Sequence, residues 1–146
     1  MSLEIGWLQR EFHQLSADEL YQLMRFRQHQ LSGLGLLQEV DADGRDPLAW
    51  HLMGFAHERG LVACARFCLP GEEGALIRVD RLLCEPLPGL EEQLFLQVME
   101  RVERIFKLPL ECEVTDAQIP LLKKRGFDIV VDRPAARSGM VCLHRG

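Results

Sequence analysis

The stretch AWHLMGFAHERGLVACARFCL, residues 49–69, decides the fold of this chain. Residues 49–57 and residues 61–69 are two runs dominated by apolar side chains, and each has the length of a β-strand. Between them lies Glu58-Arg59-Gly60, a short polar segment that ends in a glycine, as tight turns often do. The stretch therefore predicts a β-hairpin.

The residues after the hairpin predict a third strand and a crossover. Apolar residues recur along residues 75–87 in the manner of a long strand. After a proline–glycine break, residues 91–106 carry an apolar stripe at helical spacing, and residues 110–114 have the character of a short strand. Because a strand, a helix and a strand in this order form a crossover unit, we expect strand 75–87 to lie antiparallel to 61–69 and parallel to 110–114.

The two ends of the chain add helices and strands. Ser16 followed by Glu19 forms a capping box, so a first helix is expected over residues 17–31. A proline-initiated short helix is expected from Ile119 to Gly126. The last two strands are expected at residues 128–132 and 140–144. The sequence therefore predicts an α/β (α+β) fold, with helices on both faces of one mixed sheet, in a single domain of residues 1–146.

Composition excludes several classes of function. The chain has 146 residues, of which 47% are hydrophobic and 27% charged, and its net charge is −5. The negative charge argues against a nucleic-acid partner, and neither a basic run nor an apolar run of about 18 residues indicates a membrane. Five cysteines without a CxxC pair are typical of reduced thiols in a cytoplasmic protein. The sequence leaves the oligomeric state open, with a homodimer among the alternatives.

The order of these elements resembles the GNAT superfamily of acetyl-CoA-dependent N-acetyltransferases, and its ElaA-type branch in particular. The likeness spans about residues 7–140. The segments that carry it are Glu19-Leu20-Tyr21 with Arg27, His51-Leu52-Met53-Gly54-Phe55, residues 61–66, Val79-Asp80-Arg81, Arg125-Gly126-Phe127 and Ser138-Gly139-Met140. The resemblance implies a sheet of six to seven mostly antiparallel strands, acetyl-CoA as cofactor, and a small-molecule amine as acceptor.

The resemblance also implies where the cofactor would bind. In the family, a loop of the form Arg/Gln-x-x-Gly-x-Gly/Ala before the central helix holds the pyrophosphate of coenzyme A with backbone N–H groups. The matching stretch here is PGLEEQ, residues 88–93, which has lost the basic residue and two glycines and has gained two carboxylates. We therefore expect weak or absent acetyl-CoA binding. The implied cofactor-binding residues are Leu82, Leu83, Cys84, Gly89, Leu90, Glu91, Glu92, Gln93 and Leu94.

Two further positions depart from the family pattern. The tyrosine that usually protonates the leaving thiolate corresponds to Leu122, which has no proton to give. The acidic and polar pair that the ElaA-type branch has after its first helix corresponds roughly to Leu34-Gly35. A scaffold retained around an altered or lost site would show this pattern.

The weak candidates for a catalytic base are Glu39, Asp41 and His51. Glu39 and Asp41 belong to an acidic segment that we expect to be an ordinary solvated loop, and its similarity to a calcium loop fails because position twelve is Trp50. His51 lies in an apolar strand, where a structural histidine is the usual case. Cys84 is more typical of a buried thiol than of a reactive one, and no metal site is expected.

Two functions therefore stay open. The first is an N-acetyltransferase that transfers an acetyl group from acetyl-CoA to an amine. The second is a GNAT-like binding module that has lost acetyl-CoA binding and catalysis. The sequence names no acceptor.

Overall fold

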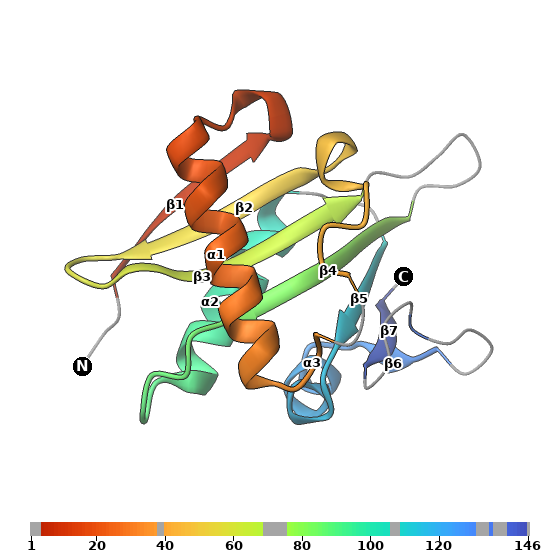
Figure 1. Ribbon diagram of the computed structural model, residues 1–146. Helices are drawn as coiled ribbons and strands as arrows, with labels where there is room; N and C mark the ends of the chain where they lie inside the picture. Colours follow the sequence, from red (N-terminus) through yellow and green to blue (C-terminus); the bar gives the residue numbers. More distant parts are fainter. Residues whose placement is uncertain are drawn as a thin grey trace.

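A seven-stranded sheet forms the centre of the molecule (Figure 1). The computed structural model describes residues 4–37, 40–68, 76–105, 109–130, 135 and 140–145. The strand order is β1-β2-β3-β4-β5-β7-β6, and β4 and β5 are the parallel pair among antiparallel neighbours. The strands are β1 (Ile5–Glu11), β2 (Trp50–Ala56), β3 (Gly60–Cys68), β4 (Ile77–Cys84), β5 (Leu110–Val114), β6 (Asp128–Ile129) and β7 (Val141–Arg145).

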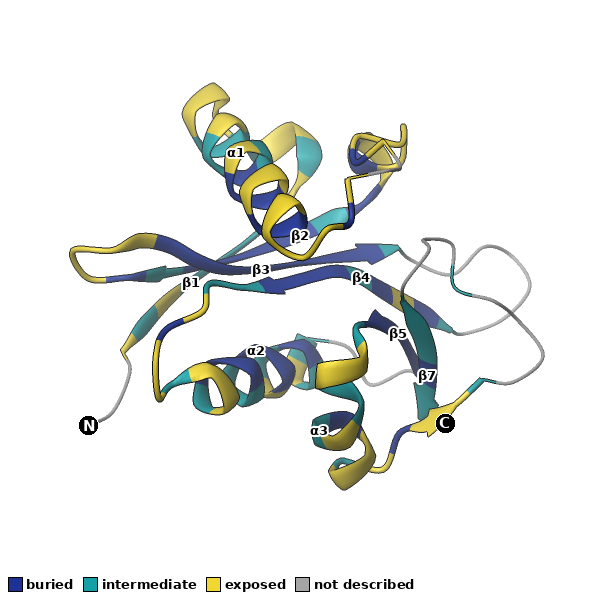
Figure 2. Cartoon of the chain, turned by 60° about the horizontal axis from the view of Figure 1, so that its bottom comes forward, coloured by how far each residue is buried: buried dark blue, intermediate teal, exposed yellow. Residues whose placement is uncertain are grey.

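Helices cover both faces of the sheet, as the sequence predicts (Figure 2). Helix α1 (Ala17–Gly33) lies on one face, and α2 (Glu91–Ile105) and α3 (Ile119–Lys124) lie on the other. Three short 3-10 turns, η1 (Phe12–Gln14), η2 (Asp46–Leu48) and η3 (Asp116–Gln118), complete the regular structure that is described. None of the helices in the described ranges is long and apolar enough to cross a bilayer.

The hairpin and the crossover are confirmed. β2 pairs antiparallel with β3, and the turn between them places Glu58 and Gly60 at positive φ. β4 pairs antiparallel with β3 and parallel with β5, and α2 forms the connection. The third strand is shorter than expected, because the chain leaves the sheet after Cys84; residue 75 and residue 106 lie outside the described part.

The N-terminal part differs from the expectation. The first element is the edge strand β1, which pairs with β2, whereas the sequence pattern predicted a helix first. Most of β1 is only half-buried, so its residues carry no clear two-residue alternation that would reveal a strand. The capping box of α1 is confirmed: the Ser16 hydroxyl accepts from the Glu19 N–H at 3.0 Å, and the Glu19 carboxylate accepts from the Ser16 N–H at 2.9 Å.

Two apolar cores lie on opposite faces of the sheet. The larger core packs the sheet against α2 and α3, and it includes Leu82, Val98 and Leu122. The smaller core packs it against α1, and it includes Leu23 and Leu83. Leu82 and Leu83 are consecutive in β4 and serve different cores, because successive side chains of a strand point to opposite faces.

Candidate functional site

The candidate site begins where β4 and β5 diverge. The two strands pair at only three positions, Ile77 with Leu110, Arg78 with Glu111, and Val79 with Cys112. Both strands continue past this point, β4 to Cys84 and β5 to Val114, without further pairing to each other. The second half of β4 therefore turns a backbone edge toward a gap in the sheet instead of toward a neighbouring strand.

A bulge in β4 accounts for the divergence. The register runs from Cys64–Leu83 to Arg66–Asp80, so Arg81 and Leu82 together face a single residue of β3. Arg81 has φ +49°, in the left-handed region that a non-glycine residue occupies only when its surroundings hold it there. The Cys64 thiol donates to the Arg81 carbonyl at 3.3 Å, which fixes the bulge from the β3 side.

The residues that the resemblance assigns to the thioester lie at this gap. The side chains of Leu82 and Leu83 are buried in the two cores, so only the backbone of this segment can meet a ligand in the gap. The Gln118 amide, from η3, donates to the Leu82 carbonyl at 3.4 Å. Burial raises the pKa of the Cys84 thiol to about 12, so this residue is a neutral thiol at physiological pH and not a nucleophile.

The loop from Glu85 to Leu90 leads from this gap to the start of α2. Gly89 has φ +78°, and the Leu90 N–H donates to the Leu87 carbonyl at 2.8 Å, so the loop closes in a tight turn. The first amides of an α-helix have no acceptor within the helix and attract anions. In α2 these amides belong to Glu91, Glu92 and Gln93, and both glutamates are exposed.

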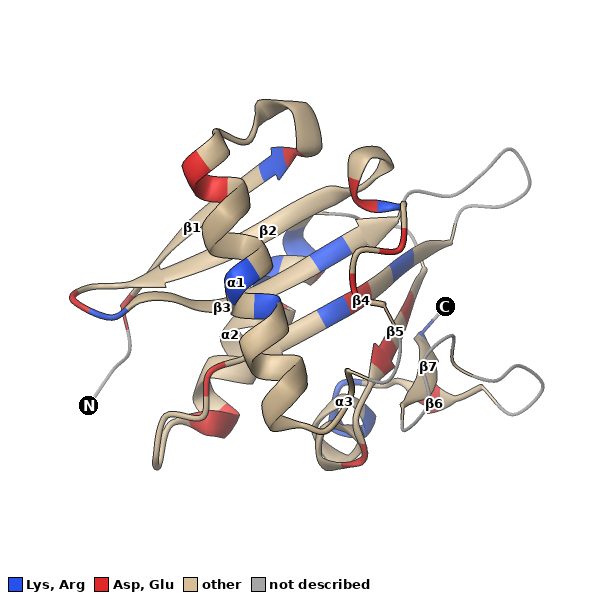
Figure 3. Cartoon of the chain, viewed as in Figure 1, with Lys and Arg blue, Asp and Glu red and all other residues tan. Residues whose placement is uncertain are grey.

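A buried network of charges lies beside the bulge, on the α1 side of the sheet (Figure 3). Arg27 of α1, Arg66 of β3 and Arg81 of β4 contribute the positive charges. The negative charges come from Asp80 of β4 and from three aspartates of the segment before β2. The shortest contacts are Arg27–Asp46 at 2.6 Å, Arg66–Asp80 at 2.6 Å, Arg81–Asp41 at 2.7 Å and Arg66–Asp43 at 2.8 Å.

This network corrects the expectation of a solvated loop. Asp41 and Asp46 are 7% and 4% exposed, because their carboxylates are turned inward to the arginines. Burial alone would raise the pKa of Asp46, but hydrogen bonds from Arg27 and the charges of Arg27 and Arg66 outweigh it and hold that pKa below its ordinary value. The hydrogen bond from Arg66 likewise lowers the pKa of Asp43. The segment is thus fastened to the sheet by ion pairs.

The structure brings two of the three candidate bases together at this network. The carboxylate of Asp41 accepts from the Nε atoms of Arg27 at 3.1 Å and Arg81 at 2.7 Å. His51 is 1% exposed, and its Nε2 lies 2.9 Å from the Asp46 carbonyl oxygen. A carbonyl can only accept, so Nε2 carries the hydrogen, and burial lowers the pKa of the ring. Glu39 lies outside the described residues.

Sequence reasoning missed the arginines of the network. The available signal was charge in apolar surroundings: Arg27 shares a helical stripe with leucines, and Arg66 interrupts an apolar strand. Charged residues are almost never fully buried unless they are paired, so such positions indicate buried partners. Among the described residues, no cluster of metal-ligand side chains is present. Leu122, which the resemblance places at the acid position, is fully buried in the larger core.

Known proteins match this chain in sequence only in part. No family model matches the chain. Over 68 residues it is 32% identical to the UPF0039 protein sll0451 of Synechocystis sp., a match that covers 47% of this chain and 44% of that protein. The chain therefore spans less than half of the curated relative that it matches.

Solved structures match the chain over nearly its whole length. An acyl-CoA N-acyltransferase from Pseudomonas aeruginosa superposes with a TM-score of 0.78 at 21% identity, covering 98% of this chain and 100% of that one. Escherichia coli ElaA superposes with a TM-score of 0.79 at 20% identity and the same coverage. An acetyltransferase of the GNAT family from Staphylococcus aureus superposes with a TM-score of 0.72 at 10% identity, covering 97% of this chain and 98% of that one. This chain has the GNAT-type acyl-CoA N-acyltransferase fold, the fold of ElaA.

Proposed function

We propose that the chain is an N-acyltransferase that transfers an acetyl group from acetyl-CoA to an amine. The observation that carries the proposal is the divergence of β4 and β5 at the bulge of Arg81. On the side of β5 it leaves the backbone edge of Leu82 to Cys84 without a partner strand, although the Leu82 carbonyl accepts from the Gln118 amide. An extended ligand arm can pair with such an edge as a strand would, and backbone N–H groups aimed at a thioester carbonyl stabilise the negative charge that develops there.

The proposed reaction is direct transfer. The neutral amine attacks the thioester carbon, a C–N bond forms, and the C–S bond breaks to release coenzyme A as a thiolate. A thiol has a pKa of about 8.5, so the thiolate can leave without prior protonation and take up a proton from the amine or from water. The absence of a hydroxyl at Leu122 therefore lowers the rate but does not prevent the step.

The start of α2 favours the second candidate function, a binding module without acetyl-CoA. Glu91 and Glu92 occupy the first turn, where the pyrophosphate would lie. A carboxylate about 6 Å from a phosphate charge, at an effective dielectric of 20 to 80, costs roughly 0.7–3 kcal/mol. Two such charges weaken binding by about ten- to ten-thousand-fold.

Repair of this loop tests both candidates. The variant carries Pro88→Arg, Glu91→Gly, Glu92→Val and Gln93→Gly, which remove two negative charges, add one positive charge and allow close approach to the backbone. We expect calorimetry at low salt to show at least roughly tenfold tighter acetyl-CoA binding than in the wild type. A matched control, Glu4→Gln with Glu58→Gln, removes two exposed carboxylates elsewhere and should leave affinity unchanged.

Turnover then separates the two functions. Release of free coenzyme A thiol is measured with a panel of primary amines for the wild type and the repaired variant. Amine-dependent release supports the transferase. Equal acetyl-CoA affinities in the two proteins would contradict the placement of the loop, and tight binding without release in either protein would favour the binding module.

A further inference from the structure

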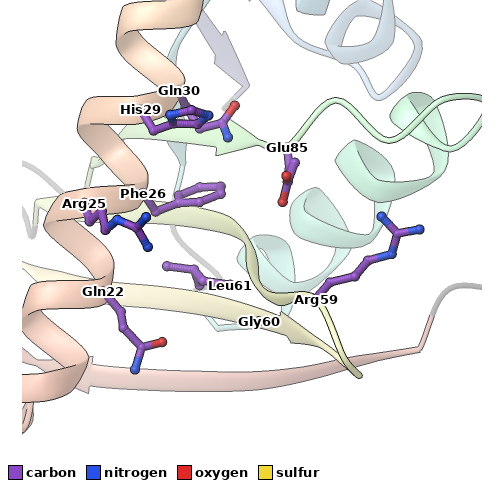
Figure 4. A pocket seen from close by; sticks show the side chains of 9 residues that line it. All are labelled: Gln22, Arg25, Phe26, His29, Gln30, Arg59, Gly60, Leu61 and Glu85. Atoms are coloured by element: carbon purple, nitrogen blue, oxygen red, sulfur yellow. The ribbon is translucent and has the colours of Figure 1, made fainter.

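A second pocket lies on the other side of β4 from the gap. It has a volume of about 320 Å³ and opens between α1, the β2–β3 hairpin and the residue that follows β4 (Figure 4). Phe26 and Leu61, both 9% exposed, supply apolar surface. Because the hairpin and β3 adjoin β4 on the side opposite to β5, this pocket is separate from the site proposed for acyl transfer.

Three charged side chains that line the pocket have no partner among the described residues, whereas Gln22, which also lines it, donates to Asp18 at 2.6 Å. Arg25 of α1, Arg59 of the hairpin turn and Glu85 after β4 all line it, and none of them forms an ion pair or a side-chain hydrogen bond within the described ranges. This contrasts with the neighbouring network, where every arginine is paired. Charges that stay unpaired around a concave surface are available to a ligand.

Gln30 supplies the second, independent indication. Its side chain lines the pocket and the residue is only 8% exposed, yet its amide has no hydrogen-bond partner among the residues described. None of the buried side-chain polar atoms in the described part lacks a partner, so the unpartnered Gln30 amide reaches the open space of the pocket, where a ligand can meet it. Figure 4 shows Gln30 and Phe26 extending from α1 toward β3 and β4, so the amide can meet a ligand held between these elements.

The signs of the charges select the class of ligand. A polyanion would be repelled by Glu85, and a simple amine would be repelled by the two arginines. A molecule that carries one carboxylate and one ammonium satisfies both signs, and an apolar substituent satisfies Phe26 and Leu61. The volume is at the lower end of the range for ligand pockets, which suits a single small metabolite rather than a nucleotide.

We propose that this pocket binds a free α-amino acid with an apolar side chain. Arg59 holds the α-carboxylate, Glu85 accepts from the α-ammonium, and the Gln30 amide completes the hydrogen bonds, while Arg25 lies on the opposite side of the pocket from Arg59 (Figure 4). Guanidinium groups suit the carboxylate because their donors match its two oxygens. The proposal stands apart from acyl transfer, because the pocket and the gap lie on different sides of β4.

Three probe molecules test the proposal by calorimetry. L-leucine has both charges, leucinamide lacks the carboxylate, and N-acetyl-L-leucine lacks the ammonium. We expect L-leucine to bind at least about tenfold more tightly than either analogue, since a hydrogen bond to a charged group contributes that much or more. Glu85→Gln should weaken the binding of L-leucine at least tenfold and leave the affinity for N-acetyl-L-leucine unchanged. Arg59→Gln should weaken the binding of L-leucine and leave the affinity for leucinamide unchanged.

Two further variants complete the test. Gln30→Leu should weaken L-leucine binding several-fold, and Lys124→Gln, an exposed charge on α3, should not alter it. Absence of heat with 10 mM L-leucine in the wild type would overturn the proposal. Equal affinity for all three probes would also overturn it, because the charges would then have no role.

Discussion

At the residue scale, the molecule is distinguished by a buried network with three arginines and four aspartates. Arg66 is 1% exposed and bonds to three of the aspartates, Asp43, Asp46 and Asp80. Loss of one member of such an ion pair destabilises the fold, because it leaves other charges buried and unpaired. The network therefore holds the segment before β2 against β3 and β4.

Arg66→Met tests this role. The change keeps the aliphatic volume but leaves each of the three carboxylates with one arginine partner fewer, and we expect it to lower the free energy of unfolding by about 3 kcal/mol. Urea denaturation measures the loss. The matched control is Arg104→Met, whose pair with Glu100 is 67% and 56% exposed and should contribute less than about 0.5 kcal/mol. Similar losses in the two variants would show that the network is not a buried one in solution.

His51 gives the protein a specific dependence on pH. Burial lowers the pKa of the folded histidine, so the unfolded chain binds the proton first, and the free energy of unfolding falls as the pH drops below about 6.5. Asp43 and Asp46 have lowered pKa values, so their contribution is complete above about pH 4 and is lost as the pH falls further.

Denaturation of His51→Gln at pH 8 and pH 5 checks the first of these windows. A glutamine amide can still donate to the Asp46 carbonyl, so stability at pH 8 should change little. The loss between pH 8 and pH 5 should be smaller than in the wild type. His57→Gln removes a histidine that is 92% exposed in its side chain and should leave the pH profile as it was. An unchanged pH profile of stability in His51→Gln would mean that other groups cause the loss between pH 8 and pH 5.

At the element scale, β1 depends on a close approach to β2. Gly54 of β2 lies opposite Trp7, and a Cβ atom at Gly54 would lie 2.7 Å from the Trp7 ring and 3.0 Å from the Ile5 side chain. The ring is covered on another side by Arg101, whose guanidinium carbon is 5.9 Å from its centroid. The glycine therefore gives the indole the room that it needs at the edge of the sheet.

Gly54→Ala should destabilise the protein by about 1–3 kcal/mol, because the added methyl group forces the indole or the backbone to move. Gly6→Ala is the control, since its Cβ atom would meet its nearest neighbour, the Phe55 carbonyl oxygen, at 3.8 Å. Trp7→Leu should cost less in the Gly54→Ala background than in the wild type, as expected for two residues in contact. Additive losses in the double mutant would argue against the steric explanation. Urea unfolding of the wild type and the four variants measures these losses.

At the scale of the whole molecule, the two cores share the sheet and should unfold together. Leu23 of α1 belongs to the smaller core and Met99 of α2 to the larger core, and they are 1% and 0% exposed. Each change to alanine should cost about 2–5 kcal/mol. Leu48→Ala, at 84% exposure, should stay within about 0.5 kcal/mol. Tryptophan fluorescence and far-UV circular dichroism should give coincident transitions in all variants; separate transitions in Leu23→Ala would show that α1 detaches by itself.

Much of the fold follows from the sequence because its signals are local. The hairpin turn at Glu58-Arg59-Gly60, the capping box at Ser16 and the apolar stripe of residues 91–106 each depend on residues a few positions apart. The crossover follows from the order of the elements and the rule for parallel connections. β1 escaped prediction because a half-buried edge strand lacks strict alternation, and its partner β2 lies some 45 residues further along the chain.

The candidate site depends on contacts that no local pattern records. Arg81 and Asp41 are 40 residues apart, and Arg66 and Asp43 are 23 apart, so their pairing exists only once β3, β4 and α1 are packed. The gap beside Leu82 arises from a bulge of one residue, at which the spacing of the residues in the larger core changes from two, Ile77 to Val79, to three, Val79 to Leu82. By itself the sequence determined the hairpin, the crossover and the first helix, and it predicted an altered cofactor loop at residues 88–93. Only the tertiary structure decided which charges are buried together, where the sheet opens and where a second pocket forms, because these follow from register and packing between distant segments.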